Sequence, residues 1–358
     1  SGADQPQWGE TFSRNMVSSE RDLPETFNPE TGENLKWSAR LGTETHSTPV
    51  IAHGRVLIGT NNGEPRDPKH KGDRGILMCF DEKTGAFLWQ LAVPKLTNSI
   101  YWDWPRAGIC STATVEGDRV YIVSNRGEVL CLDLQGMANG NQGPYRDEGR
   151  HAVPPEEAPL EMDARDADIL WTFDLPKECG VRQHDSAHSS ILLHDSFLYV
   201  NTSNGVDDSH RQIHAPNAPS LVVLDKHTGR LVAQDDEHIG PRIFHSTWSS
   251  PSLGQVNGQT LVFFGGGDGV VYAFEALSPA ALQSSDVIKL KKVWWFDCDP
   301  TAPKENVHRY NSNRQESPSN IVGLPIFHRN KVYVVSQGDL WWGKNEARLT
   351  CIDATQRG

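Results

Sequence analysis

Two pairs of histidines are the residues whose type and spacing most directly indicate chemistry in this chain. His184 and His188 form one pair, and His210 and His214 form the other. Neutral imidazole is a common ligand of transition metals, so loops that bring both pairs together would form a metal site. A spacing of four residues brings side chains together on one face of a helix, whereas on a strand or in a loop it does not bring them together in this way. Loop histidines without a metal therefore remain the alternative interpretation.

A second set of polar and aromatic residues is suited to holding a small polar ligand. They lie at the starts of β-rich segments and in the long loops between them, and long loops in a compact fold are usually functional or disordered. The predicted ligand-binding residues are His46, Asn62, Asn125, Arg126, His188, Asn204, Asp207, Asp208, His245, Trp248, Asp268, Asp339, Trp341, Trp342 and Lys344. Ordinary turn chemistry explains the Asn-Gly and Asp-Gly pairs equally well, and the two tryptophans equally suit a core plug or a partner anchor.

A sequence repeat accounts for the elements that must position these residues. Its first copy runs from His46 to Trp89: an apolar strand, a polar turn, a second strand, a polar loop, a third strand ending in Asp, a Thr-Gly turn, and a strand closing on Trp. Four further copies follow, the last without its closing strand. Short strands in sets of four predict an all-β fold, a β-propeller of four-stranded blades with five repeat units visible. In a propeller, first-strand starts and the loops between second and third strands open onto one face.

The pattern Asp81-x-x-Thr84-Gly85-x-x-x-Trp89 resembles the repeat of the PQQ-like (quinoprotein-type) β-propeller family of exported bacterial proteins. Weaker echoes stand at Asp225 and Asp353, and the resemblance covers roughly residues 35–358. That family includes PQQ-dependent dehydrogenases and non-catalytic scaffolds such as the outer-membrane-protein assembly propeller. The resemblance therefore implies the fold more strongly than the function, and it implies seven or eight blades.

Two functions follow from the resemblance. The favoured one is a non-catalytic binding or scaffold propeller that engages a small polar ligand or a partner protein through the face around the central channel. The alternative is a PQQ-dependent, calcium-assisted dehydrogenase of alcohols or sugars, with Asp207, Asp208 or Asp339 as base. The chain lacks the adjacent cysteine pair usual in quinone-dependent alcohol dehydrogenases. Whether it is an enzyme stays open at this point.

The organisation along the chain is one domain preceded by an arm. Residues 1–33 are expected to form an irregular arm and residues 34–358 a single propeller, with an acidic, proline-rich and solvated insertion at about 134–168. Residues 34–41 resemble a closing strand that would complete the fifth unit. The ring is therefore either a closed five-blade ring or a fragment of a seven- or eight-blade ring.

Charge and composition exclude several partners. A net charge of −12 argues against nucleic acid, which needs a basic face, and no apolar run is long enough to span a membrane. The first residue is Ser, which we interpret as a processed or cut N-terminus, so a periplasmic or otherwise exported location is expected. Equivalent positions predict buried cysteines at Cys79, Cys131 and Cys351. A disulfide among the other three, Cys110, Cys179 and Cys298, stays open.

Overall fold

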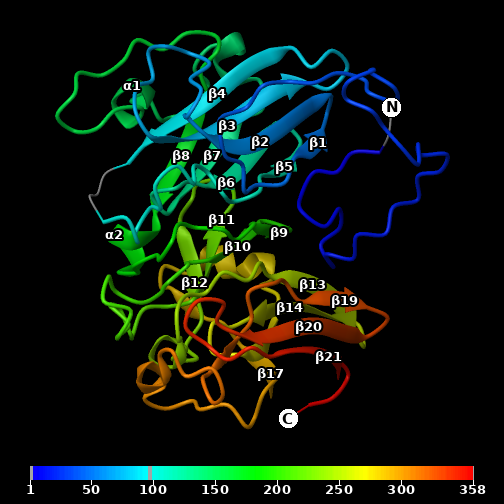
Figure 1. The fold of residues 1–358 in the computed structure, drawn as a ribbon, viewed down its shortest axis with the longest axis vertical. Coiled ribbons are helices and arrows are strands. Elements are labelled where there is room, and N and C mark those ends of the chain that lie inside the picture. Colours follow the sequence, from blue (N-terminus) through cyan, green and yellow to red (C-terminus); the bar gives the residue numbers. More distant parts are fainter. Residues whose placement is uncertain (1–2, 96–98, 358) are drawn as a thin grey trace.

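The computed structural model describes residues 3–95 and 99–357, and it is nearly all β. Five mainly antiparallel sheets follow one another along the chain. Figure 1 shows them in succession, from the sheet of β1–β4 at one end of the molecule to the sheet of β19–β21 at the opposite end. The predicted all-β fold with four-stranded repeat units is confirmed.

The sheets correspond to the sequence repeats. The first blade contains β1 (Val50–Ala52), β2 (Arg55–Asn61), β3 (Arg74–Asp81) and β4 (Phe87–Pro94). The second contains β5 (Thr114–Glu116), β6 (Arg119–Val123), β7 (Glu128–Asp133) and β8 (Ile169–Asp174). The third contains β9 (Leu192–His194), β10 (Phe197–Asn201), β11 (Leu221–Asp225) and β12 (Leu231–Gln234). The fourth contains β13 (Ser252–Val256), β14 (Gln259–Gly265), β15 (Val270–Glu275) and β17 (Lys292–Asp297).

The fifth sheet and the helices complete the described elements. The fifth blade contains β18 (Ser319–Asn320), β19 (Ile326–His328), β20 (Lys331–Gly338) and β21 (Ala347–Asp353). The helices are short: α1 (Glu148–His151), α2 (Leu175–Cys179), η1 (Gly136–Asn139), η2 (Gly240–Arg242), η3 (Pro279–Gln283) and η4 (Val307–Tyr310). No helix of the described part of the chain has the length and apolar character needed to cross a membrane.

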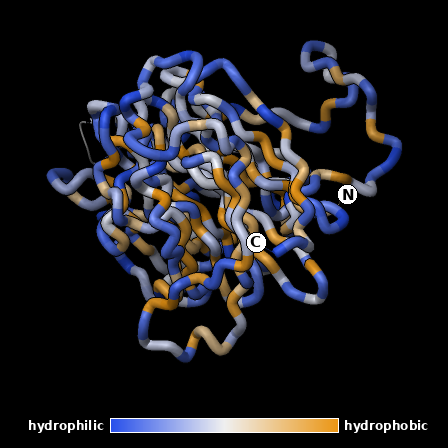
Figure 2. Tube along the Cα trace, turned by 90° about the horizontal axis from the view of Figure 1, so that it is seen from below, coloured by the Kyte–Doolittle hydropathy of each residue, from blue (hydrophilic) through white to orange (hydrophobic). Residues whose placement is uncertain are grey.

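The third strands form the core because blades pack against both of their faces. Strands β3 and β11 are therefore nearly continuous runs of buried apolar residues instead of alternating ones. Figure 2 shows the hydrophobic stretches concentrated within the body and hydrophilic loops around it. Packing between neighbouring blades is thus the main apolar contribution to the fold.

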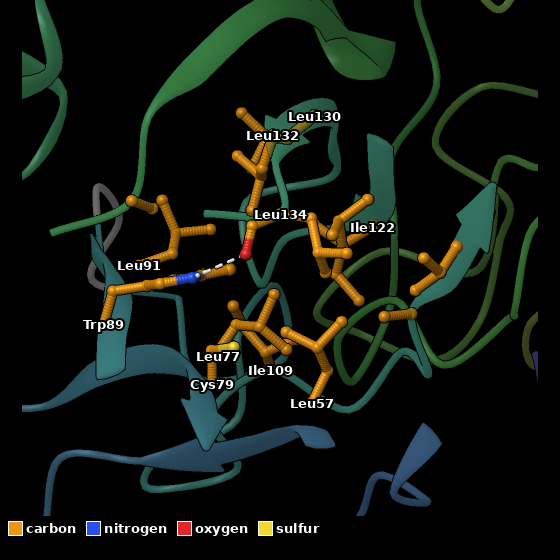
Figure 3. Close-up of a cluster of buried hydrophobic side chains, with 14 of the residues drawn as sticks. Leu57, Leu77, Cys79, Trp89, Leu91, Ile109, Ile122, Leu130, Leu132 and Leu134 are labelled. Carbon is orange, nitrogen blue, oxygen red and sulfur yellow. Dashed lines mark hydrogen bonds between the residues drawn. The ribbon is translucent and has the colours of Figure 1, made fainter. Parts of the chain in front are cut away.

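Tryptophans near the starts of the fourth strands join one blade to the next. The indole of Trp89 donates to the carbonyl of Leu134 at 3.0 Å, as Figure 3 shows, and that of Trp171 donates to Lys226 at 3.2 Å. Each acceptor directly follows the Asp that ends the third strand of the following blade. A buried indole N–H needs such a partner, so the contact fixes how neighbouring blades sit.

A glycine lies beneath each of these indole rings. A Cβ placed on Gly136 would come within 2.7 Å of Trp89, and one on Gly229 within 2.5 Å of Trp171. Both glycines also have positive φ. Gly229 of the Thr228-Gly229 turn therefore serves the preceding blade as well as its own turn, and Gly136 occupies the corresponding place in the second blade.

The third blade has Ala233 in its last strand where the first two blades have this tryptophan, and it packs differently. Its last strand, β12, pairs in parallel with an extra strand, β16 (Ile288–Lys289). This extra strand comes from the segment between the third and fourth strands of the fourth blade, and it covers the edge of β12. Apolar residues around η3, including Leu277 and Leu282, pack against the same core. This segment replaces the missing indole at the junction.

The N-terminal arm crosses the first strands of the blades. Gln5 pairs with Ile51, and further backbone bonds join the arm to the other blades: Val115 to Pro6 at 2.7 Å, Leu253 to Phe12 at 2.8 Å and Phe327 to Ser13 at 3.0 Å. Arg14 supplies the contact to the third blade, at the carbonyl of Ile191. Residues 5–14 therefore strap all five blades together, while a later loop of the arm projects beside the body (Figure 2).

The described residues do not form a closed five-blade ring. Residues 34–49 form no strand, and Trp37 donates to Glu82 of the first blade at 2.8 Å instead of adding a strand to the fifth. Within the described chain β21 pairs with β20 alone, and its Leu349 is 75% exposed. Figure 1 places the first and fifth sheets at opposite ends. Five-blade closure through residues 34–41 is therefore not observed, and the blades form an open arc.

The acidic insertion is not simply solvated, contrary to expectation, because its charges pair with the first two blades. Asp166 accepts from Lys69 at 2.5 Å, and His151 contacts Glu128 at 3.1 Å. Burial alone would raise the pKa of Glu128, but the hydrogen bond and charge of His151, together with Arg126, hold it at about 2. Paired charges therefore dock the insertion onto the arc.

All cysteines of the described residues are free. No disulfide therefore forms among Cys110, Cys179 and Cys298, for which one had stayed open. Cys79 and Cys131 are buried as predicted. Cys351 is exposed, and that prediction was wrong because its strand, β21, is the outer edge of the arc.

Candidate functional site

The starts of four first strands meet at one hollow. His46, Cys110, His188 and Trp248, which stand at equivalent repeat positions, all line a cavity of about 400 Å³. A second cavity of about 470 Å³ shares His46 and His188 with the first. The two cavities also share Asp185 and Trp341, and we describe them together as the hollow.

Three histidines from different loops form a cluster, and two of them, His210 and His245, line the hollow. His184 precedes the third blade, His210 lies in its long loop, and His245 precedes the fourth blade. One nitrogen from each ring lies within 4.8 Å of the others, and the Nε2 atoms of His184 and His210 are 3.0 Å apart. The expected histidine set therefore differs from the observed one: His245 joins His184 and His210. His188 lines the hollow separately, and His214 is exposed.

Two of these imidazoles are fixed by hydrogen bonds on their outer side. His184 donates from Nδ1 to the carbonyl of Val206 at 2.8 Å. His245 donates from Nδ1 to a carboxylate oxygen of Asp339, also at 2.8 Å. Because both partners can only accept, the Nδ1 atoms carry the protons in the neutral rings, and each Nε2 presents a lone pair.

Aromatic rings enclose the histidines. Tyr101 stacks on His184 with centroids 5.6 Å apart and meets His210 edge-on at 4.6 Å. Asp339 accepts from the backbone N–H groups of Trp341 at 3.0 Å and Trp342 at 2.8 Å. The same carboxylate thus orients a histidine and the turn that carries both tryptophans.

The electrostatics of the hollow reflect burial. Burial raises the pKa of Asp185 to about 6, with His245 opposing the shift and the charge of Asp339 adding to it. Burial, followed by the neighbouring His245 and His210, lowers the pKa of His184 to about 3. Asp185 and the next residue, Ser186, both adopt left-handed backbone conformations, with φ of 60° and 83°. Consecutive strained residues of this kind cluster at functional sites.

Several predicted ligand-binding residues instead support the loops. The amide groups of Asn62 and Asn204 bind backbone carbonyls. The remaining polar predictions bond to other side chains: Asn125 to Asp103, Arg126 to Glu128, Asp207 to Gln212, Asp208 to Arg182, Asp268 to Tyr272, and Lys344 to Asp299. None of these eight lines the hollow as described.

Several residues of the hollow were not predicted from the sequence, among them Asn320 and Thr112. Asp185, Tyr101 and Trp104 line it, and Trp8 reaches it from the arm. The aromatic run from Tyr101 to Trp104, between the first two repeats, is a signal that could have identified two of them. Trp8 carries no such signal, because its position depends on the path of the arm.

The five sheets and the hollow at their first strands define a PQQ-like repeat β-propeller. Residues 73–290 match the family model described as outer membrane protein assembly factor BamB, and the chain belongs to that family.

Two quinoprotein dehydrogenase structures share the fold at low sequence identity, and a BamB structure is similar at a lower TM-score. The quinohemoprotein alcohol dehydrogenase of Comamonas testosteroni is 14% identical with a TM-score of 0.51, covering 96% of this chain and 49% of that one. A europium-containing methanol dehydrogenase is 13% identical with a TM-score of 0.51, covering 96% of this chain and 58% of that one. BamB from Moraxella catarrhalis is 13% identical with a TM-score of 0.44, covering 89% and 61%. The chain spans about half to three-fifths of these structures, and no curated protein matches it.

The hollow does not fit PQQ. That quinone is a polycarboxylate, so a site for it needs Arg or Lys side chains that face its carboxylates. The described lining contains the carboxylates of Asp185 and Asp339 and neither Lys nor Arg. Arg126 and Lys344, the expected cations, pair elsewhere with Glu128 and Asp299. The carboxylates of PQQ would therefore meet no basic side chain in the described lining.

Proposed function

We propose that this protein is a binding propeller of the extracytoplasmic space that holds a small, neutral, hydroxylated ligand of the size of a sugar in the hollow. The observation that carries the proposal is Asn320, which lines the hollow and is 1% exposed. Neither its amide nitrogen nor its amide oxygen has a partner among the described residues. A buried amide left unpaired costs about 1–3 kcal/mol, which a ligand hydroxyl would recover.

The rest of the lining suits the same chemistry. Trp248 and Trp341 offer apolar faces, and Gln337 and Thr112 add hydrogen-bonding groups. Stacking on indole with amide and hydroxyl hydrogen bonds around it is a good environment for a polar ring. The carboxylate of Asp339 disfavours an anionic ligand, which also argues against PQQ.

The proposed location rests on the family. The family model is described as an outer membrane assembly factor, which supports an extracytoplasmic position. Separating periplasm from cytoplasm in cells that express the native gene, followed by immunodetection, tests this part separately.

Ligand binding is tested by titrating the protein with neutral mono- and disaccharides and with the matching uronic acids, using calorimetry and tryptophan fluorescence. We expect binding of a neutral member and a loss of about tenfold or more in Asn320→Ala, as expected for one lost hydrogen-bonding group. Trp295→Ala, at a tryptophan that is 53% exposed and outside the hollow, is the control. Binding of uronates or PQQ alone would overturn the proposal. So would a partner protein captured through Trp341 in the absence of any sugar binding.

A further inference from the structure

We propose that His184, His210 and His245 bind one divalent transition-metal ion of the Zn²⁺, Co²⁺ or Cu²⁺ class at the wall of the hollow. Imidazole nitrogens favour these borderline transition-metal ions, whereas calcium prefers oxygen ligands. The inference does not depend on the proposed sugar ligand, because Asn320 carries that proposal and the histidines would hold the ion. The two arguments share only the carboxylates of Asp185 and Asp339.

The spacing of the nitrogens is close to that of a coordination sphere. Ligands 2.0–2.1 Å from a tetrahedral ion lie about 3.3 Å from one another. The Nε2 atoms of His184 and His210 are 3.0 Å apart, and all three nitrogens lie within 4.8 Å. Closing the longest separation requires a small rotation of a side chain, and His210 is only half-buried.

The outer hydrogen bonds of the rings favour metal binding. Histidine ligands usually donate their other N–H to a carbonyl or carboxylate, and this orients the coordinating lone pair. Val206 accepts from His184 and Asp339 accepts from His245, so both Nε2 atoms face the cluster. In the metal-free protein His210 can donate to His184, but Nε2 of His245 remains buried without a hydrogen-bond partner among the described residues.

A carboxylate that lines the hollow lies beside the cluster. Asp185 lies 3.6 Å from Nε2 of His184 and 3.6 Å from Nε2 of His245. Its Oδ1 is buried and makes no hydrogen bond within the described structure. The left-handed backbone at Asp185 holds it beside the histidines. The carboxylate of Asp185 thus lies beside two of the three imidazoles and also lines the hollow, so Asp185 would contact the ion or a water bound to it.

Cobalt reports such a site directly, because Co²⁺ in a tetrahedral nitrogen site absorbs visible light. Purified full-length protein is stripped with a chelator, titrated with Co²⁺ and then with Zn²⁺, and analysed for metal content. We expect one ion per chain, a visible spectrum that Zn²⁺ abolishes, and a melting temperature that rises with Zn²⁺, as binding to the native state requires. No spectrum and no bound ion at about 1 mM metal, far above the affinity of structural zinc sites, would overturn the proposal.

Matched variants locate the site. His210→Gln is expected to weaken Co²⁺ binding by about 100-fold or more, because one of three nitrogen ligands is lost. Asp339→Asn, which changes only the outer partner of His245, is expected to weaken it by about 10- to 100-fold. His214→Gln, in the same loop as His210 but exposed, is the control and should bind as the wild type does. Circular dichroism verifies folding of each variant. Equal Co²⁺ binding by wild type and folded His210→Gln would refute the assignment.

Discussion

Arg14 is the residue whose replacement best tests how the arm holds the blades. It is fully buried, and burial lowers its pKa to about 9. Its guanidinium donates to the carbonyls of Trp8 at 2.5 Å, Pro251 at 3.1 Å and Ile191 at 3.2 Å. One side chain therefore joins the arm to the third and fourth blades.

Arg14→Met removes the charge and keeps a stem of similar length. Each of the three buried carbonyls left without a donor costs about 1–3 kcal/mol. Relief from burying a cation offsets several kcal/mol of that sum. We expect a net loss of about 3 kcal/mol in the free energy of unfolding.

Urea unfolding followed by tryptophan fluorescence and far-ultraviolet circular dichroism measures this loss. Arg21→Met, at an exposed arginine of the same arm, should change stability by less than about 0.5 kcal/mol. Limited proteolysis should cut the arm of Arg14→Met faster than that of the wild type. If Arg14→Met is as stable as Arg21→Met, the strap does not stabilise the arc and the reasoning fails.

Three further predictions concern the blades. In urea unfolding, Trp89→Ala should cost about 3–5 kcal/mol of stability and Trp89→Phe about 1 kcal/mol, because Phe keeps the packing but loses the hydrogen-bond donor. Trp295→Ala, at an exposed indole, is the control and should cost little. Equal losses in Trp89→Ala and Trp295→Ala would contradict a stabilising role of the junction. The pKa of Glu128 in the folded protein lies below its ordinary 4.5, so its contribution of up to about 3 kcal/mol to the free energy of unfolding is present above pH 4.5 and is lost as the pH falls toward 2. Glu128→Gln should flatten this part of the stability–pH curve. An unchanged curve would refute the pairing of Glu128 with His151. Lys344→Met should cost about 3 kcal/mol by leaving the buried carboxylate of Asp299 with less charge compensation, and a neutral effect on the melting temperature would contradict this.

Strands and blades were predictable because their signals are local. The alternation and Asp-Thr-Gly-Trp pattern around Trp89 specify four strands and a turn without reference to the rest of the chain. Equivalent repeat positions also predicted which first-strand residues would share a face, and His46 and Trp248 do line one cavity.

The histidine cluster was only half predictable, because it depends on how loops travel in three dimensions. A spacing of four suggested His188 and His214 as partners, but neither side chain points to the cluster, since these loops are not helical. His245 belongs to the connection to another blade, and Asp185 reaches the cluster through a left-handed turn. Left-handed backbone conformations are difficult to predict from residue type, except where they require glycine.

The tryptophan junctions have a consequence for how such a chain can be inherited and rearranged. The indole of each junction is encoded in one repeat, whereas the carbonyl and glycine that receive it are encoded in the next, as for Trp171 with Lys226 and Gly229. Deleting or transplanting one repeat therefore breaks two junctions, and a duplicated repeat fits only if it brings both halves in phase. Nearest-neighbour terms of this kind dominate the stability of repeat proteins. Each blade is thus encoded by one sequence repeat, but its stability depends on the pair of neighbouring blades that share a junction.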